Sequence, residues 1–189
     1  MRIISGKYGG RHLPKGVPSG IRPTTDSSRE AIFNILQNFT DFNSLQVLDI
    51  CSGTGALGIE ALSRGAEHCN FIDKSKISIE YLKNCLDYFK IPNENYSIIC
   101  KDALRALKEL GSKEPLPQFD LVFTDPPYKE FLNNKIIHDL IQTKLVHIGT
   151  ILMAEHSIHE IIDKVHSIKF LSNKRYGETI IEIIEFTGI

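Results

Sequence analysis

The segment that decides the fold runs Val47-Leu48-Asp49-Ile50-Cys51-Ser52-Gly53-Thr54-Gly55-Ala56-Leu57-Gly58. Its first four residues predict a short buried strand, and the residues from Ala56 to Arg64 predict a helix that Gly65 ends. Between them the glycines match G-x-G-x-x-G, and Asp73 follows about 20 residues later, at the end of the next predicted strand. A strand, a glycine turn and a helix in this order are typical of an α/β domain that binds a nucleotide-like ligand.

The alternation of strands and helices continues along the chain. Strands are expected over residues 47–50, 70–72, 96–100, 119–123 and 150–154, with two closing strands around residue 170 and over 180–186. Helices are expected over residues 56–64, 75–89, 103–110 and 133–143. This order predicts a parallel, doubly wound sheet that is covered by helices on both faces.

The first 24 residues form a separate region in this interpretation. Arg2 to Leu13 predicts a small β-hairpin with several glycines at or near its turn, and Lys15 to Pro23 is a connector rich in Gly and Pro. A helix is expected to begin near Ser27, because Ser27 and Glu30 fit a capping box. We therefore expect a hairpin and connector over residues 1–24 and a larger domain over 25–189.

Length and composition bound the class of protein. A chain of 189 residues suffices for one domain with a sizeable core. No apolar run approaches the length of a membrane span or a signal peptide, so we expect a cytoplasmic protein without membrane contact. The four cysteines are widely separated and form no C-x-x-C pair, so no metal site is expected.

Charge is distributed unevenly along the chain. The net charge is −1, yet residues 1–25 contain five Lys or Arg and no acid, which leaves −6 on the remainder. A basic segment on an acidic body is typical of a region that contacts phosphates. Short basic termini are also often merely solvated, and charge alone does not separate these two interpretations.

Two classes of cofactor fit the glycine loop. The spacing to Asp73 matches a dinucleotide site, which keeps a nicotinamide oxidoreductase as an alternative. Asp49 at the strand end, however, would repel a pyrophosphate and would suit the cationic amino-acid end of S-adenosylmethionine, whose ribose hydroxyls Asp73 can bind. Asp102 is placed to contact an adenine amino group or to cap the next helix. The predicted cofactor-binding residues are Asp49, Ser52, Gly53, Gly55, Asp73, Lys74, Asp102 and Ala103.

Asp125-Pro126-Pro127-Tyr128 follows the fourth predicted strand and carries the most specific chemical signal. The Asp125 carboxylate and the Pro126 carbonyl can each accept one N–H of an exocyclic nucleobase amine, which aims the nitrogen lone pair at a methyl donor. Consecutive prolines fix φ near about −65° and so set the carbonyl direction in advance. Tyr128 offers a ring face for a flipped base. These four residues are the predicted catalytic group, and an ordinary proline-rich turn is the alternative.

Taken together, these motifs resemble the small-subunit ribosomal RNA guanine-N2 methyltransferases of the RsmD type. The resemblance covers nearly the whole chain. Its elements are residues 2–6 and 10–13, Arg22-Pro23-Thr24 with residues 29–36, residues 49–66, 125–128, Glu155-His156 and residues 176–179. It implies a doubly wound, seven-stranded class I (Rossmann-like) methyltransferase sheet with a small N-terminal β-hairpin, and S-adenosylmethionine as cofactor.

The resemblance also implies a substrate and a binding surface. The substrate would be a guanine in 16S ribosomal RNA, within a partly or fully assembled small subunit, and the enzyme is expected to be a monomer. The predicted RNA-binding residues are Arg2, Lys7, Arg11, Arg22, Thr24 and Arg29. Tyr128 departs from the family, which often has Phe there, and leaves adenine-N6 chemistry open.

Three alternatives remain besides the oxidoreductase. Amino-methylation of adenine in DNA or RNA, or of a protein glutamine, would use the same type of Asp-Pro-Pro-Tyr motif. A non-catalytic RNA-binding module is a third possibility, although the complete motif argues against it. Glu155 and His156 follow the fifth strand and could face the site, but as a lone acid and histidine they are expected to be structural.

Overall fold

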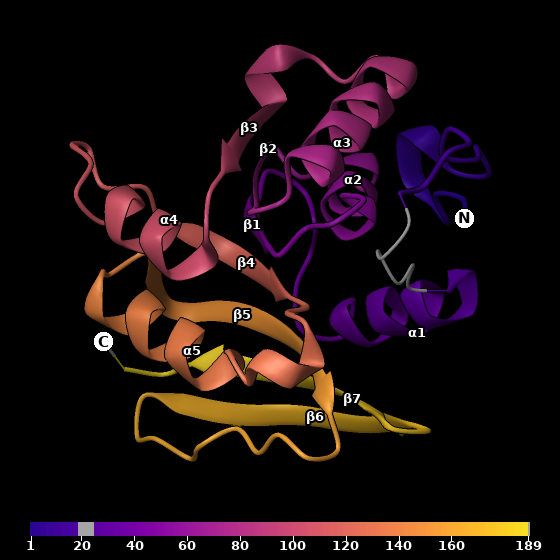
Figure 1. The fold of residues 1–189 in the computed structure, drawn as a ribbon. Helices are drawn as coiled ribbons and strands as arrows, with labels where there is room; N and C mark the ends of the chain where they lie inside the picture. The colour runs from indigo at the N-terminus through magenta and orange to yellow at the C-terminus, as the bar shows by residue number, and fades with distance from the viewer. Residues whose placement is uncertain (19–24, 189) are drawn as a thin grey trace.

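The computed structural model describes residues 1–18 and 25–188. Its centre is a seven-stranded sheet with the order β3-β2-β1-β4-β5-β7-β6 (Figure 1). Strands β1 to β5 are parallel, whereas β7 pairs antiparallel with both β5 and β6. The strands are β1 (Gln46–Ile50), β2 (His68–Asp73), β3 (Tyr96–Cys100), β4 (Phe119–Thr124), β5 (Val146–Ser157), β6 (Ile168–Tyr176) and β7 (Thr179–Phe186).

Helices cover both faces of this sheet, and each face has its own apolar core. The helices are α1 (Asp26–Leu36), α2 (Ala56–Ser63), α3 (Lys76–Phe89), α4 (Ala103–Leu110) and α5 (Asn133–Gln142), with 3-10 turns η1 (Gly6–Tyr8), η2 (Asn93–Asn95) and η3 (Tyr128–Glu130). Helices α1, α2 and α3 pack on one face, and α4 and α5 pack on the other. The doubly wound, seven-stranded α/β fold predicted from the sequence is therefore confirmed.

Several boundaries differ from the sequence prediction. β5 begins at Val146 and ends at Ser157, well beyond the expected 150–154, because its far end pairs with β7 through seven residues in register. The first helix begins at Asp26, and its N-cap is Thr25, whose hydroxyl accepts the Ser28 N–H at 3.1 Å. The predicted capping box with Ser27 at the N-cap is therefore wrong, since an equally suitable hydroxyl lies two residues earlier.

Two kinds of feature are absent from the described part of the chain. Within residues 1–18 and 25–188, no helix is long and apolar enough to cross a lipid bilayer. The same residues contain no group of three or more His, Cys, Asp or Glu side chains that could hold a metal ion.

The N-terminal hairpin is short and packs into the main core. A single antiparallel bridge joins Arg2 to His12, and the turn between them contains η1. Ile3, Tyr8 and Leu13 are buried in the same apolar cluster as α1, α2 and α3. The described part of the hairpin therefore shares the core of the sheet domain.

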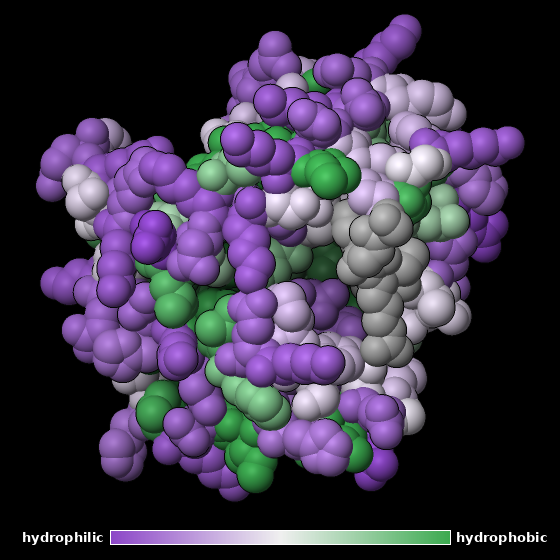
Figure 2. Space-filling model, in the orientation of Figure 1, coloured by the Kyte–Doolittle hydropathy of each residue, from purple (hydrophilic) through white to green (hydrophobic). Residues whose placement is uncertain are grey.

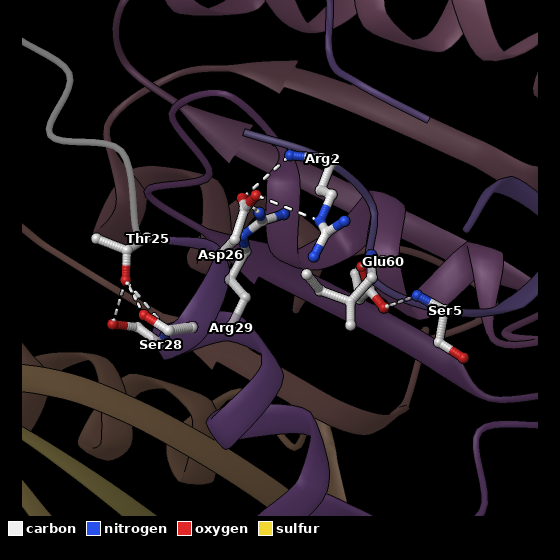
Figure 3. A network of polar contacts seen from close by, with 9 residues as sticks. Arg2, Ser5, Thr25, Asp26, Ser28, Arg29 and Glu60 are labelled. Atoms are coloured by element: carbon white, nitrogen blue, oxygen red, sulfur yellow. Dashed lines mark hydrogen bonds and ion pairs between the residues drawn. The ribbon is translucent and has the colours of Figure 1, made fainter. Parts of the chain in front are cut away.

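Two carboxylates, one on α1 and one on α2, hold this hairpin against these helices (Figure 3). The fully buried carboxylate of Glu60, on α2, accepts the backbone N–H of Ile4 at 2.6 Å and of Ser5 at 3.0 Å. It also accepts a hydrogen bond from the Arg64 Nε–H at 2.8 Å. Asp26, at the start of α1, accepts the backbone N–H of Arg2 at 3.1 Å and forms an ion pair with Arg29.

Replacing Glu60 tests this anchor. Glu60→Ala leaves two backbone N–H groups and a guanidinium without their acceptor, so we expect it to lower the free energy of unfolding by about 3–5 kcal/mol. Hydrogen exchange of the Ile4 and Ser5 amides should accelerate in the same variant. Chemical denaturation and exchange mass spectrometry provide the measurements. Glu67→Ala, at an exposed position, is the control and should change stability by less than about 0.5 kcal/mol.

Candidate active site

A cavity of about 740 Å³ lies at the carboxyl ends of the parallel strands. It is lined by the glycine loop after β1, the ends of β2 and β4, and the first turn of α1. The turn between β6 and β7 closes another side of it, through Tyr176 and Thr179. Figure 2 shows a hollow in the middle of this face, with apolar side chains at its base and hydrophilic ones around it. Crevices at this edge of open α/β sheets are the usual ligand sites.

The glycines of the loop allow a tight turn and close packing. Gly55 has φ of +73°, and its N–H donates to the Ser52 carbonyl at 2.7 Å, which closes the turn before α2. A Cβ at Gly58 would lie 2.3 Å from the Phe71 ring, so α2 can approach β2 only with glycine there. The backbone of the loop is thereby held against the sheet, and its Gly53 segment faces the cavity.

Asp73, at the end of β2, fastens the glycine loop from the other side. Its Oδ2 accepts the Gly53 N–H at 2.8 Å, and its Oδ1 accepts the Ser75 N–H at 2.8 Å. Each carboxylate oxygen has a further lone pair, and the side chain lines the cavity. Asp73 can therefore hold the loop and accept ligand hydroxyls at the same time.

Asp49 is a carboxyl group in an apolar environment. It is 2% exposed, and its Oδ2 accepts the Gly58 N–H at 3.0 Å. Burial raises the pKa of Asp49 to about 7, the negative charge of Asp73 acts in the same direction, and the Gly58 hydrogen bond opposes both. Because the side chain also lines the cavity, a cationic ligand group there would favour its ionised form.

The remaining predicted cofactor residues line the cavity but differ in their contacts with the protein. Lys74 lines the cavity and pairs with Glu130 at 2.8 Å, which links β2 to η3. Asp102 caps α4 by accepting the Arg105 N–H at 3.2 Å, and it lines the cavity beside Ala103. The buried Ser52 hydroxyl lines the cavity and has no hydrogen-bond partner within the described part of the chain.

The Asp-Pro-Pro-Tyr segment lies where the sequence predicted, directly after β4. The Asp125 N–H approaches the Ile50 carbonyl at 3.5 Å, so the segment is placed beside the end of β1. All four residues, 125–128, line the cavity together with Asp49 and Asp73. The structure therefore brings the predicted catalytic residues and the predicted cofactor-binding residues, except Gly55, into the lining of one cavity.

Tyr128 is held by two residues that lie far away in the sequence. Its hydroxyl donates to Glu155 Oε1 at 2.8 Å and lies 2.8 Å from Thr179 Oγ1. Partial burial and the negative charges of Glu155 and Asp125 together hold the pKa of Tyr128 well above its usual range. The phenol therefore stays protonated at neutral pH.

Sequence reasoning missed some of the cavity lining. Glu155 was expected to be structural, yet it lines the cavity and contacts Tyr128. Thr25, Ser28 and Thr179 also line it and were not predicted. The signals in the sequence were the position of Glu155 near the end of β5 and the presence of Glu155 and Thr179 among the elements of the resemblance, whereas their proximity depends on the pairing of β5 with β7.

The predicted RNA-binding residues differ in their exposure to solvent. Lys7 and Arg11 are exposed on the hairpin, and Arg11 stacks over the rings of Tyr88 and Phe89. Arg2 is exposed beside Asp26. Arg29 is fully buried and paired with Asp26 (Figure 3), a position that does not fit a phosphate contact. Arg22 and Thr24 lie outside the described residues.

Comparisons with known proteins identify the family of the chain. The family model described as "Conserved hypothetical protein 95" matches residues 1–185. The chain belongs to this family. The resemblance to the RsmD type found in the sequence is thereby confirmed.

Named relatives extend this comparison. "Putative rRNA methyltransferase YlbH" of Bacillus subtilis is 33% identical over 189 residues, the full length of both chains. "Ribosomal RNA small subunit methyltransferase D" of Haemophilus influenzae is 38% identical over 128 residues, which cover 68% of this chain and 64% of that protein. The solved structure of the "Putative methyltransferase yhhF" from Escherichia coli superposes with a TM-score of 0.85 at 28% identity, over 99% of this chain and 98% of that one.

The raised pKa of Asp49 gives a stability prediction with a definite sign. The folded chain retains the Asp49 proton up to about pH 7, whereas the unfolded chain loses it near pH 3.8, so rising pH favours unfolding between these values. Asp49→Asn keeps an acceptor for Gly58 but cannot ionise, so we expect it to be more stable than wild type above pH 7. Urea unfolding between pH 4 and 8 measures the difference. Equal stability of the two proteins at pH 8 would show that Asp49 is ionised without cost.

Proposed function

We propose that this protein transfers a methyl group from S-adenosylmethionine to the exocyclic N2 amino group of a guanine in 16S ribosomal RNA. The observation that carries the proposal is the single cavity that contains Asp125-Pro126-Pro127-Tyr128 together with Asp49 and Asp73. The names of the Haemophilus influenzae and Bacillus subtilis relatives support ribosomal RNA as the substrate. The small subunit, partly or fully assembled, is the proposed partner, and a monomer the proposed active form.

The residues present fit the proposed cofactor. The cofactor supplies a sulfonium-bound methyl group, and its other polar groups are an amino acid, a ribose and an adenine. Asp49 is an acid suited to the ammonium group, and Asp73 has lone pairs for ribose hydroxyls. Ser52 adds a buried hydroxyl with no partner among the described residues. The cavity of about 740 Å³ lies within the usual range for a small-molecule site.

Catalysis in this proposal is alignment of a poor nucleophile. An exocyclic amine of guanine has its lone pair delocalised into the ring. The Asp125 carboxylate and the Pro126 carbonyl each accept one amine N–H, which brings the nitrogen toward tetrahedral geometry and directs its lone pair at the methyl group. The Tyr128 ring provides a surface on which the base can stack. No strong general base is required, because the methylated nitrogen loses its proton readily.

The proposal predicts a specific modification in cells. Ribosomal RNA from cells lacking this protein should lack one N2-methylguanosine, and wild-type protein should restore it. Asp125→Ala should fail to restore it, because the amine loses the acceptor that it needs in the transition state. Nucleoside mass spectrometry of mapped RNA fragments provides the measurement.

Calorimetry separates catalysis from folding in the same variant. Asp125→Ala should bind S-adenosylhomocysteine as tightly as wild type does, since Asp125 is assigned to the amine alone. Restoration of the modification by Asp125→Ala would show that the segment is only a turn. Loss of an N6-methyladenosine in place of an N2-methylguanosine would overturn the assignment to guanine.

RNA is proposed to be held by exposed cations of the N-terminal hairpin. Lys7 and Arg11 are on its surface, and neither lines the cavity. Cofactor binding and methyl transfer do not need these charges, and both side chains remain exposed to a phosphate although Arg11 also stacks over Tyr88 and Phe89. Deleting the hairpin would not test this proposal, because Ile3, Tyr8 and Leu13 belong to the core.

A single charge variant gives the cleaner test. Lys7→Gln should weaken RNA binding and flatten the slope of log K against log salt by roughly 0.7–0.9, because the variant neutralises one phosphate fewer. Cofactor affinity should remain unchanged. Lys113→Gln, at an exposed position after α4, is the matched control and should leave the slope as in wild type. An unaltered slope for Lys7→Gln, measured by filter binding or fluorescence anisotropy, would remove Lys7 from the RNA surface.

A further inference from the structure

A chain of hydrogen bonds borders the cavity beside the Asp-Pro-Pro-Tyr segment. It runs from the Thr179 hydroxyl to the Tyr128 hydroxyl and on to the Glu155 carboxylate, with both oxygen–oxygen distances equal to 2.8 Å. Glu155 pairs in register with Ile181, and Thr179 is two residues away on β7, so both side chains lie on one face of the sheet. All three residues line the cavity.

The number of hydroxyl hydrogens determines which group donates and which accepts in these two hydrogen bonds. Tyr128 has one hydroxyl hydrogen, and that hydrogen is donated to Glu155 Oε1. The contact between Tyr128 and Thr179 therefore requires the Thr179 hydroxyl to donate to the tyrosine oxygen. Both hydroxyl dipoles thus point toward the Glu155 carboxylate and hold it in one orientation.

A buried carboxylate beside a base-binding surface discriminates between purines. The Watson–Crick edge of guanine has an N1–H next to its N2 amino group, whereas adenine has an unprotonated N1 with a lone pair next to its N6 amino group. A carboxylate can accept the guanine N1–H, but it repels the lone pair of the adenine N1. Asp125 and Pro126 are assigned to the amino group in either base, so they do not make this distinction.

We propose that Glu155, oriented by the hydroxyls of Tyr128 and Thr179, selects guanine by accepting the N1–H of the target base. This inference rests on the proposed methyl transfer to a nucleobase amine and adds the residue that chooses the base. It also gives the Tyr128 hydroxyl a use that the phenylalanine often found in the family cannot provide. The ring of Tyr128 serves stacking, and its hydroxyl fixes the carboxylate at the edge of that surface.

The test compares guanine with 2-aminopurine at the methylated position. The substrate is a small ribosomal subunit reconstituted around RNA that carries either base at this position. 2-Aminopurine keeps the amino group at C2 but has an unprotonated N1. Wild-type enzyme should prefer guanine in kcat/KM, and in Glu155→Gln this preference should fall by about 10- to 100-fold, the change expected for one hydrogen bond to a charged group. A glutamine amide can accept from guanine N1–H or donate to 2-aminopurine N1, so it loses the discrimination.

Three further variants separate the role of the Glu155 carboxylate from effects on folding and overall charge. Glu155→Asp keeps the carboxylate and should retain a preference for guanine. Tyr128→Phe keeps the ring but removes the donor that orients Glu155, so its preference should lie between those of wild type and Glu155→Gln. Glu185→Gln changes the same charge on β7 outside the cavity and should leave the preference intact. Affinity for S-adenosylhomocysteine, measured by calorimetry, should be the same in all of them.

The outcomes separate this inference from the proposed function. An unchanged preference in Glu155→Gln, with guanine still methylated, would overturn the role of Glu155 and leave the proposed function in place. The same holds if wild-type enzyme methylates both bases equally well. If wild-type enzyme methylates neither subunit, the proposed function fails and this inference fails with it.

Discussion

The reversal of strand order between β1 and β4 is the constraint on which the rest of the structure depends. From β1 the chain adds β2 and then β3 on one side, and it then crosses to place β4 and β5 on the other side. Helices α2 and α3 consequently cover one face and α4 and α5 the other, and the cavity lies in the gap beyond the ends of β1 and β4. That gap contains Asp49 and Asp125, and each proposed step of the chemistry uses residues at its edge.

Charge and polarity in this gap are unfavourable for folding, and the surrounding structure must compensate for them. Asp49 is buried with one hydrogen bond from Gly58, and burial raises its pKa to about 7. The buried hydroxyl of Ser52, which lines the cavity, has no hydrogen-bond partner within the described residues. Each such group costs about 1–3 kcal/mol. Groups of this kind are expected where a ligand completes the hydrogen bonding.

The sequence predicted those parts of the site whose signals are local. The glycine loop, Asp73 and the Asp-Pro-Pro-Tyr segment each follow a strand directly, and strand ends in a parallel sheet meet at one edge, so sequence position alone brings them together. The first helix was placed almost correctly, but its cap was not, because three neighbouring hydroxyls, Thr25, Ser27 and Ser28, are equivalent on propensity alone.

The parts that the sequence could not predict depend on tertiary contacts. Arg29 was expected to contact RNA, yet its side chain is fully buried, where it pairs with Asp26 three residues earlier and lies near Glu60. Glu155 appeared as an isolated acid, because Tyr128 is 27 residues before it and Thr179 is 24 residues after it. Only the antiparallel pairing of β5 with β7 combines them into one chain of hydrogen bonds.

The first turn of α1 connects the proposed RNA surface to the site of chemistry. Asp26 holds the backbone of Arg2, while the adjacent Thr25 and the following Ser28 line the cavity. Glu60 fixes the same hairpin to α2, the helix that follows the glycine loop. A phosphate bound on the hairpin would thus lie at a fixed distance from both the cofactor loop and the base-binding surface. Such rigid positioning matters because an exocyclic amine reacts only when its lone pair is aligned with the methyl group, and small misplacements lower the rate steeply.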